Sequence, residues 1–345
     1  MKGTKLDEVC KDRNNNLDII RFIAAIMVIV AHSFPLCYGY IDPLGKWTNG
    51  GLSIGGLAVG IFFVSGGFLI SKSMERTQKA KIFFMARIKR ILPELIIVVF
   101  ICAFVLGPLV TDFSLKEYFT DIKTYKYLFN AILIPIYELP GVFENNVYSG
   151  IVNGSLWTLP VEFMCYIACY IFYRLHFLER KWYLRITIPA AVIFVICVMI
   201  LFGNNGNIIN IIRPVILFYI GMGLYVFRDK ILFSNIKLCL YIGLFCIMVF
   251  FRFDIIAMLL CFPYIIFHLA YGTKIKFSNF TKYGEFSYGI YLWGMPVGQI
   301  ICLIFNNIDW YANAILTAFV ALLLAIIQGY VIKYGMNRNR RKKHG

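Results

Sequence analysis

Arg21 and His32 are the residues of the first long apolar segment that could do chemistry. They are eleven positions apart, which at about 100° per residue is three helical turns and roughly 20°, so both project from nearly the same face of a helix. The helical rise separates them by about 16 Å along the axis. A guanidinium binds anions and a neutral imidazole accepts a proton. One helical stripe would therefore offer a fixed cation at one end and a proton acceptor at the other.

Each of these two residues also has a structural interpretation. Asp18 stands three residues before Arg21, so a local salt bridge could hold Arg21 at the membrane interface. A lone membrane histidine often forms a hydrogen bond to a neighbouring helix. An ionisable group inside a bilayer costs several kcal/mol unless it is paired. The shared face and the wide separation favour the functional interpretation of both residues.

Glu162 is the second candidate for chemistry, in an apolar segment that begins near residue 155. The helical rise puts it roughly 10 Å inside that helix, while His32 lies about 9 Å from the outer end of its own helix. A buried carboxylate beside a histidine fixes the tautomer and raises the basicity of the imidazole. Pro160 would open the local backbone hydrogen bonding. The alternative is a structural carboxylate bonded to a neighbouring helix.

A basic cluster precedes the third apolar segment. Arg87 and Arg90 are one helical turn apart and share a face, which suits bidentate capture of a phosphate. Two simpler interpretations stay open: Glu94 could pair with Arg90, or the cluster could bind lipid headgroups.

The elements that must position these residues are membrane helices. Apolar residues make up 60% of the 345 and charged residues 15%, and the mean hydropathy is +0.74. A soluble domain carries about a quarter charged residues, so this composition is typical of a chain embedded in lipid. We predict an all-α polytopic membrane protein with about ten transmembrane helices. They lie at about 17–38, 54–71, 91–110, 155–173, 186–202, 211–227, 237–252, 254–271, 287–305 and 311–333.

The distribution of positive charge tests this count. With the N-terminus inside, 27 of the 34 lysines and arginines fall on the cytoplasmic side, as the positive-inside rule requires. Six fall outside, among them Arg213 and Arg252, and Arg21 lies within the membrane. Both termini are therefore predicted to be cytoplasmic. The net charge of +16 then reflects topology and anionic lipids, and no nucleic-acid partner is expected. We predict one membrane domain over 1–345: an N-terminal segment 1–16, a ten-helix core 17–333 and a basic tail 334–345.

Four short motifs share a pattern with a known family. The Arg, ten residues and His of the first segment are joined by Ile61–Leu69, Arg87–Arg90 and Ser287–Trp293. These stretches resemble the acyltransferase-3 family of integral membrane acyltransferases, many of which modify bacterial sugars. The second is similar to its Phe-Phe-x-x-Ser-Gly-Phe segment with an added glycine, the third to Arg-x-x-Arg and the fourth to Ser-Tyr-x-x-Tyr-Leu. Members often carry a histidine just after the last motif, where Gly294 stands here, and this departure concentrates the chemistry on His32.

The resemblance implies an O-acyltransferase in the bacterial cytoplasmic membrane. Its donor would be cytoplasmic acyl-CoA, most commonly acetyl-CoA, with phosphates at Arg87, Arg90 and Arg21. His32 would act as general base or carry the acyl group transiently, and Glu162 would orient it. The acceptor would be a hydroxyl of a cell-surface carbohydrate or glycolipid. No metal and no permanently bound cofactor are expected. The residues expected to line the pocket are Ser65, Ser155, Trp157, Tyr288 and Tyr291.

Three questions stay open at this point. A transporter or flippase of a lipid-linked saccharide would also use buried charge, although usually in paired halves or broken helices. The external stretch from about 111 to 154 could cover a site or simply connect two helices. The acceptor, the acyl-chain length and the oligomeric state do not follow from the sequence.

Overall fold

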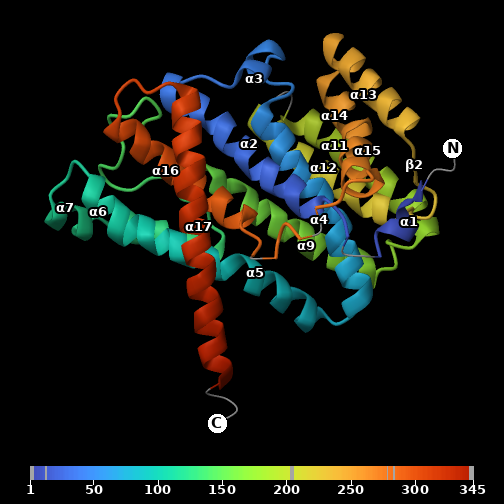
Figure 1. The fold of residues 1–345 in the computed structure, drawn as a ribbon, viewed down its shortest axis with the longest axis horizontal. Coiled ribbons are helices and arrows are strands. Elements are labelled where there is room, and N and C mark those ends of the chain that lie inside the picture. Colours follow the sequence, from blue (N-terminus) through green and yellow to red (C-terminus); the bar gives the residue numbers. More distant parts are fainter. Residues whose placement is uncertain (1–3, 12–13, 203–205, 278, 283, 342–345) are drawn as a thin grey trace. The chain divides into compact units, whose positions relative to one another are not determined.

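The computed structural model describes residues 4–11, 14–202, 206–277, 279–282 and 284–341. These residues are helical apart from loops and one small antiparallel pair of strands, in which β1 (Thr4–Lys5) lies beside β2 (Leu232–Phe233) (Figure 1). The all-α prediction is confirmed.

Eight helical segments within the described residues are long and apolar enough to cross a membrane. The chain is therefore a multi-pass membrane protein. The spanning segments are α2 (Leu17–Tyr38), α4 (Ile54–Thr77), Ala80–Val110 with α5 (Ala80–Ile101) and α6 (Gly107–Val110), Gly154–Arg174 with α9 (Thr158–Arg174), α12 (Gly206–Val226), Asp254–Gly272 with α14 (Asp254–Leu260) and α15 (Phe262–Phe267), α16 (Ser287–Ile304) and α17 (Trp310–Arg341).

The other two predicted spans correspond to shorter apolar helices. These are α11 (Ile188–Phe202) with 15 residues and α13 (Asn235–Phe250) with 16 residues. The tight hairpin predicted after α13 is present, since Arg252 takes a left-handed backbone conformation (φ 67°) and α14 begins two residues later. The cytoplasmic placement of both termini stays a prediction.

Short helices and turns lie in the connecting segments and within some of the spanning segments. They are α1 (Leu6–Val9), α3 (Pro43–Trp47), α7 (Leu115–Thr120), α8 (Ile122–Lys126), α10 (Arg180–Trp182), the 3-10 turns Tyr127–Ile132 and Gly154–Trp157, and π-helical turns at Cys102–Leu106, Tyr183–Thr187 and His268–Gly272.

The chain divides into two compact units, which are described one at a time. Unit 1 consists of Met1–Ala24, Pro43–Phe83 and Val161–Lys282, and unit 2 consists of Ala25–Asp42, Phe84–Pro160 and Tyr283–Gly345. The single membrane domain over 1–345, with its ten-helix core at 17–333, stays a prediction.

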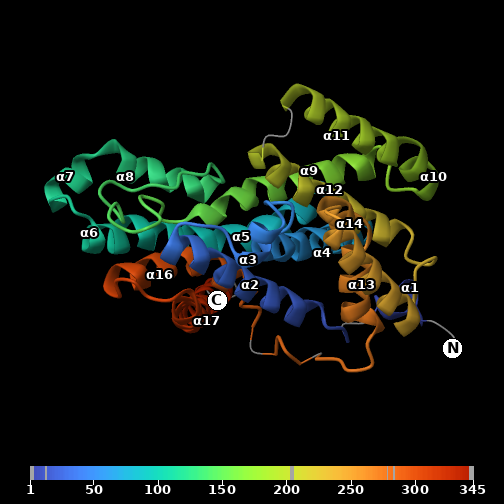
Figure 2. The same cartoon turned by 90° about the horizontal axis from the view of Figure 1, so that it is seen from above.

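In unit 1, α4 and α12 lie side by side (Figures 1 and 2). Glycines allow their backbones to touch. A Cβ atom at Gly67 would lie 2.0 Å from the carbonyl oxygen of Phe218, and one at Gly221 would lie 2.1 Å from that of Val64. Small residues at a helix interface are the usual means of close packing within a bilayer, where hydrophobic burial does not drive association. Gly67 of α4 and Gly221 of α12 therefore allow this close helix packing.

In unit 2, α17 packs along α16. The contact face of α17 repeats every three or four residues and consists of small or amide side chains, while the residues between them are large, apolar and exposed, as for Phe319 at 61%. The buried stripe is Ala314, Thr317, Ala321, Ala325 and Gln328. The exposed face suits lipid and the stripe suits a helix neighbour.

The segment between α6 and α9 is fixed to unit 2 by amide hydrogen bonds. Gln299 of α16 donates to the carbonyl oxygens of Tyr148 (2.7 Å) and Ile151 (2.8 Å), and Asn146 donates to the Gln299 side chain (2.7 Å). Asn130 closes the inner loop by donating to Ile136 O and accepting from Ile136 N. Figure 2 shows α7 and α8 beyond the end of α5. This segment is therefore a packed part of the unit.

Candidate functional site

His32 lies in α2 within unit 2, beside a fixed polar contact. Its neighbour Ser33 donates a hydrogen bond of 2.9 Å to Asn313 Oδ1 in α17, and Asn313 Nδ2 donates to Gly298 O of α16 at 3.0 Å. This network holds the helix at the position of the histidine. The imidazole is half-buried and makes no hydrogen bond to any residue in the described part of the chain. Within the described residues, its ring nitrogens therefore keep their hydrogen-bonding capacity unused.

Gly294 of α16 packs against α2 one turn before His32. A Cβ atom at Gly294 would lie 2.9 Å from Ile29 Cγ1, which is closer than apolar contacts allow. Ile29 itself is 2% exposed, so it has little room to move. A histidine at position 294 would not fit this packing. The departure from the family motif thus coincides with a tight contact between two helices.

The family motif Ser287–Trp293, in α16, is hydrogen-bonded to the start of α9. Tyr291 donates to the Ser155 carbonyl oxygen at 2.6 Å, and its hydroxyl lies 2.6 Å from Thr158 Oγ1. Asn153 Nδ2 donates to Leu292 O at 2.9 Å, and Asn153 Oδ1 accepts from Ser155 Oγ at 2.6 Å. Two of the residues predicted to line the pocket, Ser155 and Tyr291, are therefore brought together, and both are buried.

The other two predicted lining residues of unit 2 are more accessible. Trp157 is half-buried at the end of the turn Gly154–Trp157. Tyr288 is half-buried and donates to Ile91 O of α5 at 3.2 Å.

The Arg-x-x-Arg motif lies inside α5, where Arg90 forms an ion pair with Glu285 at 2.8 Å. Sequence reasoning missed Glu285, because it is distant along the chain. Arg87, one turn earlier, is half-buried with its Nε atom enclosed. The Arg90 and Glu285 side chains are 33% and 38% exposed, so an anion could still reach this end of α5. The motif therefore combines a partly exposed cation with a competing carboxylate.

In unit 1, Arg21 contacts the second family motif, Ile61–Leu69. The Arg21 guanidinium carbon lies 5.7 Å from the centre of the Phe62 ring, a distance at which a cation is attracted to a ring face. Ser65 is fully buried and donates to Phe62 O at 3.2 Å. Arg21 therefore packs against the segment Ile61–Leu69, and Ser65 supports that segment from within. The helix α2 is continuous through Arg21 and His32, as the spacing argument requires.

Glu162 lies near the start of α9 in unit 1 and accepts a hydrogen bond from the Tyr166 hydroxyl one turn later. The Tyr166 ring packs 6.3 Å from the ring of Phe218. This carboxylate thus has a local partner that would keep it oriented. Its assignment as the partner of His32 stays a prediction.

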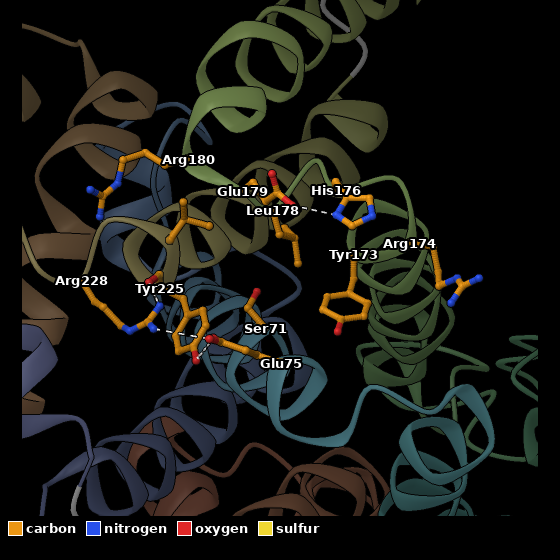
Figure 3. A pocket seen from close by; sticks show the side chains of 11 residues that line it. Ser71, Glu75, Tyr173, Arg174, His176, Leu178, Glu179, Arg180, Tyr225 and Arg228 are labelled. Atoms are coloured by element: carbon orange, nitrogen blue, oxygen red, sulfur yellow. Dashed lines mark hydrogen bonds and ion pairs between the residues drawn. The ribbon is translucent and has the colours of Figure 1, made fainter.

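Unit 1 also contains a pocket of about 630 Å³ that sequence reasoning missed (Figure 3). Three arginines contribute to its wall. In the sequence they fall in segments predicted to be cytoplasmic, where the positive-inside rule already accounts for basic residues, so they gave no signal of a site. The lining residues are Ser71, Glu75, Tyr173, Arg174, His176, Leu178, Glu179, Arg180, Tyr225, Val226 and Arg228.

Most charges around this pocket are paired. Arg228 lies between Asp7 (3.1 Å) and Glu75 (3.6 Å), and Glu75 also accepts from the Tyr225 hydroxyl. His176 Nδ1 lies 2.7 Å from Glu179. Arg174 differs, because it is exposed and makes no ion pair within the part of the chain that the structure describes. An anion entering the pocket would find this arginine available.

These features define a membrane protein with polar and ionisable side chains set among its helices, a design that fits an enzyme acting at the bilayer. The acyltransferase-3 family model, described as "Acyltransferase domain", matches residues 14–334, and the chain belongs to this family.

Two curated relatives agree with this family. An "O-acetyl transferase" of Shigella phage Sf6 is 28% identical over 334 residues, which cover 91% of this chain and 93% of the relative. "Nodulation protein 10" of Rhizobium leguminosarum bv. viciae is 32% identical over 171 residues, 47% of this chain and 45% of the relative. No solved structure matches the chain. The chain is thus an O-acetyltransferase, which confirms the predicted class over the transporter alternative.

Proposed function

We propose that the enzyme moves an acetyl group from cytoplasmic acetyl-CoA to a hydroxyl of a cell-surface or lipid-linked carbohydrate, with His32 as general base. The observation that carries the proposal is the imidazole of His32, which has no hydrogen-bond partner among the described residues while the adjacent Ser33 is bonded to α17. A general base must be free to contact its substrate and must also be held in place.

The proposed reaction needs only His32 to accept and return the transferred proton. A neutral imidazole nitrogen takes the proton of the acceptor hydroxyl, and the resulting oxygen attacks the thioester carbonyl. A C–O bond forms, the C–S bond breaks, and the CoA sulfur receives the proton that His32 holds. In the variant with a transient acyl-histidine, one imidazole nitrogen attacks the thioester, the C–S bond breaks, and the CoA sulfur takes the proton of the other ring nitrogen. The acceptor oxygen then takes the acetyl group, the N–C bond breaks, and the hydroxyl proton returns to the imidazole. In both variants we assign Glu162 to orienting His32.

We further propose that the enzyme lies in the cytoplasmic membrane with both termini inside. In this orientation Arg87, Arg90 and Arg21 face the donor side and would hold the CoA phosphates. Arginines suit this task because the guanidinium forms paired hydrogen bonds with phosphate oxygens. The pocket of unit 1 is a second place for the nucleotide end of CoA, since the exposed Arg174 has no ion-pair partner among the described residues.

The test of the mechanism is His32→Ala in purified protein with labelled acetyl-CoA. Loss of a general base lowers the rate about 10²- to 10⁴-fold, and donor affinity should change little. His344→Ala, in the basic tail 334–345, provides the histidine control. Transfer near the wild-type rate in His32→Ala would exclude the proposed mechanism.

The test of donor binding compares Arg87→Ala with Arg174→Ala. If the phosphates bind at α5, the first change weakens acetyl-CoA binding and the second does not. The opposite result would move the nucleotide to the pocket of unit 1. Unchanged binding in both would return Arg87 to lipid anchoring.

A further inference from the structure

Two buried opposite charges in unit 1 have no hydrogen-bond or ion-pair partner among the residues that the structure describes. Arg213 of α12 and Asp254, the first residue of α14, are each only 6% exposed. Neither side chain makes a hydrogen bond or an ion pair with any residue that the structure describes, and Arg213 Nε and Asp254 Oδ1 are enclosed. Buried polar groups are nearly always hydrogen-bonded, so each such exception needs an explanation.

Both charges border one short segment. Asp254 Oδ2 lies 2.7 Å from the point where a Cβ atom at Gly51 would stand, and Arg213 Nη1 lies 3.6 Å from the corresponding point at Gly56. Arg213 and Asp254 also lie within electrostatic range of each other. Two charges so placed lower each other's burial cost only in part unless they touch and are hydrogen-bonded. The arrangement thus leaves a donor and an acceptor facing one segment without a direct bond.

The chemistry of this pair selects a neutral ligand that both donates and accepts hydrogen bonds. Asp254 would repel a phosphate, and Arg213 would repel a cation. A hydroxyl group suits both, because it donates to the carboxylate and accepts from the guanidinium. An exposed aromatic ring lies in the same region: Trp47 is 48% exposed, and Arg252, two residues before Asp254, covers it at 5.0 Å.

We propose that Arg213 and Asp254 bind the hydroxyl groups of a sugar, as the acceptor site of the enzyme. The assignment as acceptor rests on the proposed function. It agrees with the predicted topology, in which Arg213 and Arg252 fall on the outer side of the membrane. The donor, by contrast, is expected to bind from the cytoplasmic side. Gly51 would then be required, because a Cβ atom there would lie 2.7 Å from Asp254 Oδ2.

The experiment uses the full-length purified protein, labelled acetyl-CoA, and alkali-treated (de-O-acetylated) surface polysaccharide of the source cells as acceptor probe. Asp254→Asn and Arg213→Gln should each lower transfer to the polysaccharide about 10- to 100-fold, as expected when a charged hydrogen-bond partner is lost. Equilibrium binding of acetyl-CoA should stay within about twofold of the wild-type value. Glu144→Gln, which alters an exposed carboxylate of unit 2, is the control and should leave both measurements unchanged.

A double variant separates binding from folding. Arg213→Met with Asp254→Leu removes both unpaired charges, so the protein should resist heat inactivation at least as well as the wild type while transfer is lost. A double variant that is less heat-stable would identify a structural pair and overturn the inference. Wild-type transfer in the single variants, or a parallel loss of acetyl-CoA binding, would overturn it as well. If the wild type itself neither binds acetyl-CoA nor transfers acetate, the proposed function fails instead.

Discussion

Gly294→Ala tests how the packing of α16 positions the helix that carries His32. The added Cβ would lie 2.9 Å from Ile29 Cγ1. Carbon atoms in contact are normally about 3.5–4.0 Å apart, so the two helices must separate by roughly half an ångström or more. Overpacking of this kind costs about 1–3 kcal/mol. A displacement of about 1 Å at a reacting group can lower a rate about 100-fold, so half of that predicts a loss of about tenfold in kcat.

The assay is acetyl transfer at saturating acetyl-CoA, together with heat inactivation in detergent. Because the clash lies at α2, kcat should fall and donor affinity should stay close to the wild-type value. A second change at Ile29 sharpens the test. Ile29→Ala removes the clashing Cγ1 atom and should restore part of the lost rate in the double variant. Ile29→Val keeps the branched carbon and should not.

Ile29→Ala alone is itself costly, since removing a buried isoleucine side chain lowers the free energy of unfolding by about 2–5 kcal/mol. The rescue is therefore measured as the coupling energy of a double-mutant cycle. Wild-type kcat in Gly294→Ala would refute the reasoning. So would an equal response of the alanine and valine partners at position 29, because only one of them removes the clash.

Three further predictions concern contacts that stabilise the fold. Tyr291→Phe should lower the stability of the detergent-purified protein by about 1–3 kcal/mol, since a buried hydroxyl with two hydrogen bonds of 2.6 Å is lost; an unchanged melting temperature would contradict this. Gly67→Val should prevent recovery of monodisperse protein in size-exclusion chromatography, because a Cβ there lies 2.0 Å from a backbone carbonyl oxygen of α12; a normal yield would contradict the close packing. Partial desolvation opposes ionisation of Asp7, but Lys11 and Arg228 outweigh it and lower the pKa of its carboxyl. Its contribution to stability is therefore present at neutral pH and lost as the pH falls through that lowered pKa, and Asp7→Asn should flatten this part of the curve of heat stability against pH.

The sequence alone determined the elements that the bilayer requires. Apolar length fixes where a helix can cross, and the predicted segments 17–38 and 287–305 agree closely with α2 and α16. The same physics singled out Arg21, His32 and Glu162, because an ionisable residue within an apolar run is costly and visible without any structure. The family motifs then identified the class of reaction, and the comparison with known proteins confirmed it.

The tertiary structure decided which polar groups find partners. Glu285 pairs with Arg90, and Asn313 bonds to Ser33, from positions nearly 200 residues or more away in the sequence. Hydropathy and helical spacing are local properties, so they cannot show such contacts. The positive-inside pattern assigns Arg213 to the outer side, whereas the structure buries it; its place inside an apolar run is a signal of that burial. Sequence thus located Arg21, His32 and Glu162 within the membrane, and only the packing of the helices determined which buried polar groups have a partner.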